Sequence, residues 1–233
     1  MCCHLRRLNI STRGKKARNT SQTSQTLPGN YPEQKSRMKV EPVMLMGKFV
    51  RLEPLSESHV ASLAKVGLEP KIWRFMRYGK IETEEQLGSW VRELLDLQAQ
   101  GTDLPFAVIH LSSGNAVGCT RYLNIDPPNR SLEIGGTWYG MDYQGTMVNP
   151  ECKYLLLQHA FEKLACIRVW FKADARNLRS IHALERIGAV QEGVLRNHMI
   201  LPDGTIRDSV VFSLIPKEWP QVKHELETHL YTS

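Results

Sequence analysis

A loop that leads into a long helix contains the residues best suited to bind an anion. Asn149 is expected to cap this helix, and Pro150 suits its first turn. Amide N–H groups at the start of a helix have no partner inside the helix, and the helix dipole is positive there. The loop over residues 143–148 would present such amides to a phosphate. We therefore expect an anion-binding site just ahead of Asn149.

The strand before this loop carries two consecutive glycines, Gly135 and Gly136. Glycine weakens a strand, and it often marks a bulge or a place where a ligand or another main chain comes close. Strand, loop and helix follow one another over residues 131–164. The glycines therefore predict a bulge next to the anion site.

The rest of the chain alternates between strand patterns and helix patterns. Residues 84–100 show an apolar stripe at helical spacing, and Asn177 is a good N-cap for the helix that follows it. Alternation in the middle, with antiparallel hairpins on either side, predicts an α/β or α+β fold with a mixed sheet and helices on both faces. Strands are expected at residues 49–55 (a sheet edge), 104–111, 116–123, 131–139, 167–173, 190–200 and 205–214, and helices at 58–66, 84–100, 149–164, 178–187 and 217–230.

Composition divides the chain into two parts. Of its 233 residues, 42% are hydrophobic and 23% are charged, as in ordinary globular proteins. The formal charge of +6 comes from residues 1–37, which contain eight Lys or Arg residues and one acidic residue. These residues are expected to be a disordered basic leader, with an organelle transit peptide as the alternative. Residues 38–233 are expected to form a single domain that is nearly neutral, which argues against a nucleic-acid partner.

Several kinds of site are missing from the sequence. The five cysteines show neither a C-x-x-C pair nor a metal-like spacing with histidine, which predicts unpaired thiols and no metal site. Motifs for nucleoside-triphosphate cleavage, dinucleotide redox chemistry, zinc proteolysis and ordinary ester hydrolysis are also missing. No apolar run reaches the roughly 20 residues of a membrane helix. We therefore expect a cytoplasmic protein without a membrane partner, unless the leader directs it to an organelle.

Four segments in this order resemble the GNAT superfamily of acyl-CoA N-acyltransferases, and most of all its RimJ/RimL-like branch of ribosomal-protein-alanine acetyltransferases. The resemblance covers roughly residues 47–230, and it is carried by residues 133–135, 144–151, 175–180 and 192–196. It implies a mostly antiparallel central sheet with a V-shaped cofactor gap between two central strands. It also implies acetyl-CoA as co-substrate and direct transfer, in a ternary complex, to a primary amine on a protein N-terminus or a small molecule. A homodimer is compatible with it.

The resemblance also implies roles for particular residues. The cofactor diphosphate would bind the loop amides, its pantetheine arm would pair with the bulged strand, and its thioester would lie beside the next helix. The cofactor-binding residues implied in this way are Trp138, Gln144, Gly145, Thr146, Met147, Val148, Asn149, Asn177 and Ser180.

The chain departs from the family pattern at two places. Met147 stands where the family loop has glycine, and a methionine there could crowd the phosphates or change the φ angle. Leu184 stands where many members have a tyrosine proton donor, so we expect Ser180 to take that catalytic role. These departures leave open a second interpretation, a non-catalytic CoA-binding or ligand-sensing module on the same fold.

Acetyl transfer also needs a base that accepts a proton from the amine. We assign this catalytic role to Glu133 on the bulged strand, and the alternative is a structural ion pair with a neighbouring Arg or Lys. Lys153, in the helix after the loop, is expected to be solvated. The aromatic residues between 73 and 78 either border the acceptor opening or belong to the core.

Overall fold

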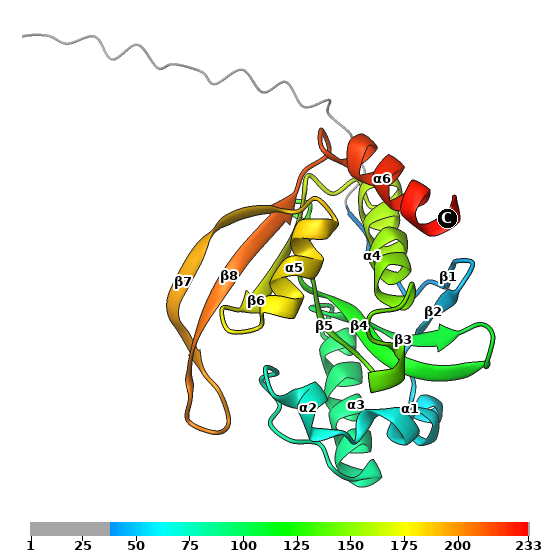
Figure 1. Ribbon diagram of the computed structural model, residues 1–233, viewed down its shortest axis with the longest axis vertical. Coiled ribbons are helices and arrows are strands. Elements are labelled where there is room, and N and C mark those ends of the chain that lie inside the picture. The colour runs from blue at the N-terminus through cyan, green and yellow to red at the C-terminus, as the bar shows by residue number, and fades with distance from the viewer. Residues whose placement is uncertain (1–37, 233) are drawn as a thin grey trace, which may run out of the picture. The chain divides into compact units, whose positions relative to one another are not determined.

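The computed structural model describes residues 38–232, which contain one eight-stranded sheet (Figure 1). The strand order is β1-β2-β3-β4-β5-β6-β8-β7, and every neighbouring pair is antiparallel except β5 with β6. The expected mixed, mostly antiparallel sheet is therefore confirmed. Its strands are β1 (Leu45–Met46), β2 (Val50–Pro54), β3 (Leu104–His110), β4 (Asn115–Asp126), β5 (Ser131–Tyr139), β6 (Arg168–Asp174), β7 (Val190–Ile200) and β8 (Ile206–Leu214).

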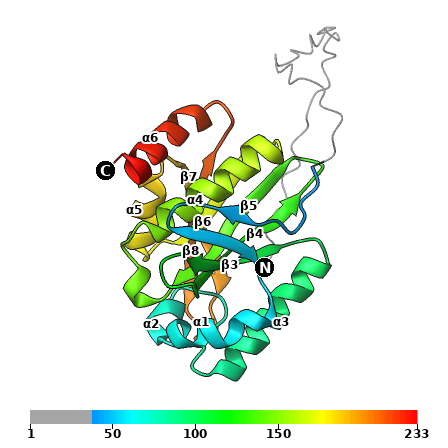
Figure 2. The same ribbon diagram turned by 90° about the vertical axis from the view of Figure 1, so that its right-hand side faces the viewer.

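Helices cover both faces of this sheet, as predicted (Figure 2). One apolar core joins the sheet to α4, α5 and α6, and a second core on the opposite face joins it to α1, α2 and α3. The helices are α1 (Val60–Gly67), α2 (Pro70–Trp73), α3 (Glu84–Ala99), α4 (Val148–Gln158), α5 (Leu178–Arg186) and α6 (Trp219–Tyr231). Short 3₁₀ turns at Glu57–His59 and Met141–Tyr143 precede α1 and α4, and a π turn at His159–Lys163 continues α4.

Local sequence signals account for several of these elements. Helix α3 begins at a capping box, in which Thr83 Oγ1 accepts from the Gln86 N–H and Gln86 Oε1 accepts from the Thr83 N–H. Asn177 caps α5 through its side chain, which accepts from the Ser180 N–H. Such signals lie within a few residues of each helix end, which is why the sequence predicted α3 and α5 well.

Two local predictions are wrong. Residues 49–55 do not form the sheet edge, because β1 pairs with the outer side of β2. Helix α4 begins at Val148 rather than after Asn149, and no side chain caps it. The Asn149 Oδ1 atom instead accepts a hydrogen bond at 3.2 Å from the buried Tyr139 hydroxyl. A buried hydroxyl needs a partner, so this tertiary contact overrides the preference of asparagine for the cap.

Glu151 joins α4 to the first strands. Its fully buried carboxylate accepts hydrogen bonds from the main-chain amides of Lys48, Phe49 and Val50 at 2.7–2.8 Å. The Tyr231 hydroxyl donates a fourth bond at 3.0 Å. These bonds satisfy the buried carboxylate and hold it on the side of α4 that faces β2, away from the loop ahead of α4. The negative charge of Glu151 therefore does not repel an anion at that loop.

The predicted leader over residues 1–37 lies outside the described residues. Within residues 38–232, no helix is long and apolar enough to cross a membrane. The same residues contain no group of three or more His, Cys, Asp or Glu side chains that could hold a metal ion.

Candidate active site

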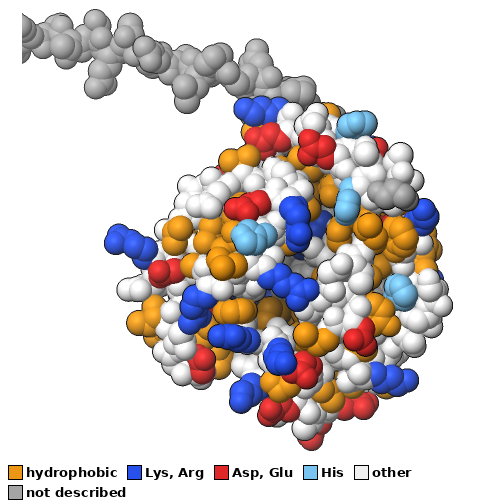
Figure 3. Space-filling view, viewed as in Figure 1, with side chains coloured by type: hydrophobic (Ala, Val, Ile, Leu, Met, Phe, Trp, Pro, Cys, Tyr) orange, Lys and Arg blue, Asp and Glu red, His pale blue; other side chains and the backbone are white. Residues whose placement is uncertain are grey.

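Strands β5 and β6 separate at the centre of the sheet. They pair over only three residues, and the last pair joins Glu133 to Trp170. Beyond this point β5 remains paired with β4 and β6 with β8, so the other edge of each strand faces a gap. A cavity of about 1220 Å³ fills the gap, and Figure 3 shows Lys and Arg side chains around a hollow near the middle of this view. The expected V-shaped gap is therefore present.

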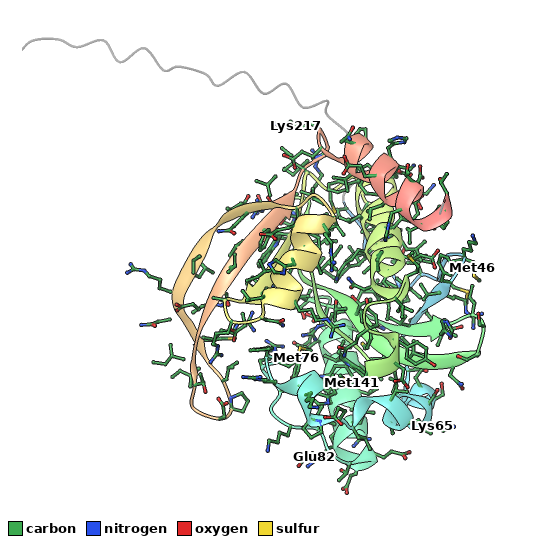
Figure 4. All side chains as sticks on the ribbon, viewed as in Figure 1. Met46, Lys65, Met76, Glu82, Met141 and Lys217 are labelled. Carbon is green, nitrogen blue, oxygen red and sulfur yellow. The ribbon has the colours of Figure 1, made fainter. Side chains whose placement is uncertain are left out.

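Most of the predicted site residues line this cavity. Val148 is the exception, because its side chain is buried in the core and its N–H donates to Thr146 Oγ1 at 3.3 Å. Met76 and Met141, which also line the cavity, lie below α5 and α4 in Figure 4. The predicted residues that the cavity brings together are Glu133, Trp138, Gln144, Gly145, Thr146, Met147, Asn149, Asn177 and Ser180.

The loop ahead of α4 has the geometry of an anion site. Gly145 has a φ of 79°, which favours glycine, and the space beside it is open. No main-chain acceptor in residues 38–232 pairs with the N–H groups of Gly145, Thr146 or Met147. These amides precede the positive end of α4, where an anion is stabilised. Arg179 of α5 adds a positive charge, and it donates a hydrogen bond to Gln144 Oε1.

Met147 does not distort this loop. Its φ of −68° and ψ of −8° are ordinary right-handed values, so the expected change of φ is wrong and glycine is not required here. The side chain packs against the core while it also borders the cavity. The doubt about the φ angle at Met147 is therefore removed, whereas crowding of a bound phosphate by its side chain stays a prediction.

The bulge in β5 is built over a buried arginine that sequence reasoning missed. The register of β4 with β5 shifts between Cys119 and Arg121, next to Gly136, whose φ is 57°. A Cβ atom on Gly136 would lie 2.6 Å from Arg121 Nε, so glycine is needed for both conformation and space. Arg121 is 2% exposed and donates to the Tyr78 hydroxyl. Its Nη1 lies 2.9 Å from Asp103 Oδ2 without hydrogen-bond alignment, so this contact is an ion pair alone.

Glu133 lies where β5 and β6 separate. Its carboxylate is buried, accepts from Asn124 Nδ2 at 2.7 Å and pairs with Lys172 Nζ at 3.3 Å. Burial raises the pKa of Glu133, although the charge of Lys172 and the bond from Asn124 oppose this shift. The structural ion pair considered as the alternative is therefore present, and the same carboxylate lines the cavity, where a base for an acceptor must lie.

The first turn of α5 forms another wall of the cavity. Asn177 Oδ1 accepts from the Ser180 N–H at 3.2 Å, which fixes the main chain of Ser180. The Ser180 side chain is half-buried, and its hydroxyl has no hydrogen-bond partner among residues 38–232. It is free to donate to a ligand. Leu184 is buried in the same wall and supplies no polar group.

Lys153 is buried in the cavity wall, contrary to the expectation that it is solvated. Only 6% of it is exposed, and its Nζ donates to Thr137 Oγ1 at 3.0 Å and lies 5.8 Å from the centre of the Phe171 ring. No carboxylate of residues 38–232 forms an ion pair with it. Burial lowers the pKa of Lys153 to about 8. The ammonium group has three donors, so it can donate further to a ligand in the gap.

The alternation of side chains along β5 divides the site between the two faces of the sheet. Leu132 and Ile134 belong to the core beneath α4 and α5. Glu133 lies between them in the strand, so its side chain faces the side that carries α1, α2 and α3. Lys172 pairs with Glu133 and faces the same side. The gap therefore joins a side near α4, where the loop amides have no main-chain acceptor among the described residues, to a side that contains a buried carboxylate.

The aromatic residues between 73 and 78 fit both expectations in part. Trp73 is buried in the second core, with ring contacts to Trp90 and Trp138. Phe75 and Tyr78 instead line the cavity. They border the side of the gap that Glu133 faces.

Comparison with known proteins gives a consistent result. The family model described as "Acetyltransferase (GNAT) domain" matches residues 50–190. A curated relative, "Putative ribosomal N-acetyltransferase YdaF" from Bacillus subtilis (strain 168), is 30% identical over 167 residues. This match covers 65% of this chain and 90% of the relative.

Solved structures agree in fold. A "putative acetyltransferase" from T. thermophilus is 39% identical with a TM-score of 0.76, and the match covers 83% of this chain and 100% of that one. The ribosomal-protein-S5-alanine acetyltransferase from Vibrio fischeri shares the fold at 18% identity and a TM-score of 0.63, over 76% of this chain and 98% of that one. The chain belongs to the GNAT acetyltransferase family, and it is an N-acetyltransferase that transfers an acetyl group to an amine.

Proposed function

We propose that this enzyme transfers an acetyl group from acetyl-CoA directly to a primary amine, on a protein N-terminus or a small molecule, while both substrates are bound. The observation that carries this proposal is the gap between β5 and β6, which joins an anion-binding loop on one side of the sheet to a buried carboxylate on the other. Acetyl-CoA supplies the activated acetyl group as a thioester.

The cavity has features that fit acetyl-CoA. The amides of Gly145, Thr146 and Met147 lie ahead of the positive end of α4, where a diphosphate would bind. The free edge of β5 offers main-chain groups to an extended arm that contains amides. Lys153 is a buried donor on the same side, and it would donate to a carbonyl oxygen in the gap. The diphosphate, the extended arm and a carbonyl of the cofactor therefore each have a group of suitable chemistry.

Glu133 would accept the proton of the acceptor ammonium. Burial raises its pKa, and an α-amine with a pKa of about 8 lies closer to the range of a carboxyl group than a lysine side chain with a pKa of about 10.4. Proton transfer is easier when the two pKa values are closer. An α-amine is therefore the better acceptor. A protein N-terminus agrees with the name of the Bacillus subtilis relative, which describes a ribosomal N-acetyltransferase.

Ser180 would donate a hydrogen bond to the thiolate that leaves. Its hydroxyl has no partner in the described part of the chain, and it lies in the wall of the cavity. The Asn177 cap holds the first turn of α5, so the hydroxyl keeps its position. Backbone donors of the bulged strand would stabilise the oxyanion that develops on the acetyl carbonyl.

The cysteines support direct transfer. Cys119, Cys152 and Cys166 are buried, and none of them lines the cavity. Burial raises the pKa of each of these thiols to about 12. A thiol is a good nucleophile only as a thiolate, so none of these three is suited to carry the acetyl group. Their unpaired state also fits a reducing compartment such as the cytoplasm.

The proposal can be tested with three measurements on the full chain. Calorimetric titration should show that acetyl-CoA binds, and mass spectrometry of a panel of amines should show products that gain one acetyl group. Double-reciprocal plots at several fixed concentrations of the second substrate should intersect. Parallel lines together with an acetylated protein would refute direct transfer, and the lack of binding would refute the role of acetyl-CoA.

A further inference from the structure

Arg207 of β8 is a buried cation in the cavity wall that has no carboxylate partner. It is 8% exposed, its Nε donates to Ser209 Oγ at 2.9 Å, and its Nη1 donates to the Phe75 carbonyl at 3.2 Å. It forms no ion pair with a carboxylate of residues 38–232. A guanidinium has five N–H donors, so these two bonds leave donors for a ligand.

Two other cations on this side of the gap, Arg121 (buried) and Lys172 (half-buried), already have counter-ions. Arg121 pairs with Asp103 at 2.9 Å, and Lys172 pairs with Glu133 at 3.3 Å. A buried charge without a counter-ion is costly in the folded protein. The carboxylates of Asp174 and Glu133 attract Arg207 without forming an ion pair with it. Because Arg207 lines a cavity, a ligand can supply a carboxylate in direct contact, and a carboxylate matches the planar fork of a guanidinium.

The register of β8 places Arg207 on the acceptor side of the sheet. Val210 and Phe212 belong to the core beneath α4 and α5, so Ser209 faces the opposite side. Arg207 lies two residues before Ser209 and donates to it, and Phe75, which follows α2, accepts its other bond. Arg207 therefore lies on the side that Glu133 faces. The loop that would bind the cofactor diphosphate lies with α4 on the other side.

We infer that Arg207 binds a carboxylate of the acceptor, and that the enzyme acetylates amines that carry a carboxylate. The amine would lie at Glu133 and the carboxylate at Arg207. This inference rests on the proposed acetyl transfer and adds the chemical class of the acceptor. Since the three acidic residues of the cavity wall, Asp103, Glu133 and Asp174, are each paired with a cation, the wall offers no unpaired acidic group to a second ammonium group, so a polyamine is poorly suited to it.

The carboxylate could belong to a free amino acid or to an acidic side chain near a peptide N-terminus. Two matched pairs of acceptors separate these sources. L-alanine and L-alaninamide differ at the α-carboxyl group, which also changes the pKa of the amine, so this pair is compared at equal concentrations of the free amine. Ala-Glu-amide and Ala-Gln-amide differ only at the side chain. In at least one pair, kcat/KM should be about 10–100-fold higher for the carboxylate, as expected for a charge-assisted hydrogen-bonded pair.

Substitution of the arginine should remove this preference. In Arg207→Gln the ratio of kcat/KM within the preferred pair should fall to about one, because the loss falls mainly on the carboxylate member. Arg207→Lys should keep part of the preference because it keeps the charge. Arg196→Gln is the matched control, because Arg196 is an exposed arginine of β7 outside the cavity, and it should leave the ratio unchanged.

Several results would overturn the inference. One is a wild-type protein that shows no preference for the carboxylate member of either pair, and this measurement needs no variant. Another is a preference that persists in Arg207→Gln, with acetyl-CoA titration as the check that the variant is folded. Equal rates of acetylation for the amide and carboxylate members of both pairs would overturn this inference and leave the proposed acetyl transfer intact. The absence of product from every amine would overturn both proposals.

Discussion

The buried ammonium group of Lys153 should make the folded protein less stable than it would be with an apolar side chain. Its pKa falls from 10.5 to about 8, because burial penalises the charged form. At about 1.4 kcal/mol for each pKa unit, holding the charge inside the fold costs about 3 kcal/mol near neutral pH. Lys153→Met keeps an unbranched side chain of similar length and removes the charge. It should therefore raise the free energy of unfolding by up to about 3 kcal/mol.

The sign of this effect can be followed with pH. Between pH 8 and pH 10.5 the unfolded lysine keeps a proton that the folded lysine has lost. The free energy of unfolding of the wild type should therefore rise across this window. Lys153→Met lacks this group, so its advantage should shrink to nothing near pH 10.5. Urea denaturation at a series of pH values measures both proteins, and Lys163→Met, at an exposed lysine of the adjoining π turn, is the matched control.

The same substitution should weaken the binding of acetyl-CoA. The Lys153 ammonium is proposed to donate to a carbonyl of the pantetheine arm, so its loss should raise the dissociation constant roughly tenfold. Calorimetric titration gives this constant for the wild type, Lys153→Met and Lys163→Met.

A Lys153→Met protein that is less stable than wild type, or whose free energy of unfolding changes with pH in parallel with that of the wild type between pH 8 and pH 10.5, would refute the stability argument. Either result would show that the buried charge is compensated in the fold.

Three further predictions concern the base, the bulge and the anchor of α4. Glu133→Gln should lower kcat/KM. The wild type should lose activity as pH falls through the raised pKa of Glu133, and the variant should not show this loss. A variant whose activity still falls at acidic pH as in the wild type would contradict this role. Gly136→Ala should destabilise the protein by more than the ~1–2 kcal/mol expected from a positive φ alone, because its Cβ would meet Arg121. Gly145→Ala, with a positive φ but open space, should cost only that amount, and equal unfolding free energies for the two variants would disprove the steric argument. Glu151→Gln should lower the free energy of unfolding by about 3–5 kcal/mol in urea denaturation, since an amide cannot accept all four hydrogen bonds, and a loss below about 1 kcal/mol would contradict this accounting.

Signals carried by neighbouring residues were sufficient to predict much of the fold. The glycine pair predicted the bulge of β5, and the order of strand, loop and helix predicted a loop with free amides ahead of α4. Asn177 was correctly expected to cap α5, because a cap depends on a side chain and an amide only three residues apart. The resemblance of four short segments then indicated the family, the gap and most of the residues that line it.

The electrostatics of the site depend instead on residues that only folding brings together. Lys153 meets Thr137 across 16 positions of sequence, and Arg207 meets the Phe75 carbonyl across 132 positions. Both cations resemble surface residues in the sequence, because burial is decided by the packing of distant elements. Likewise, Asn149 resembles a helix cap until the Tyr139 hydroxyl is placed beside it. The sequence by itself indicated the strand, loop and helix at which a thioester cofactor is proposed to bind, whereas the tertiary structure decided which buried charges lack an ion-pair partner there, and the proposed acceptor preference rests on those charges.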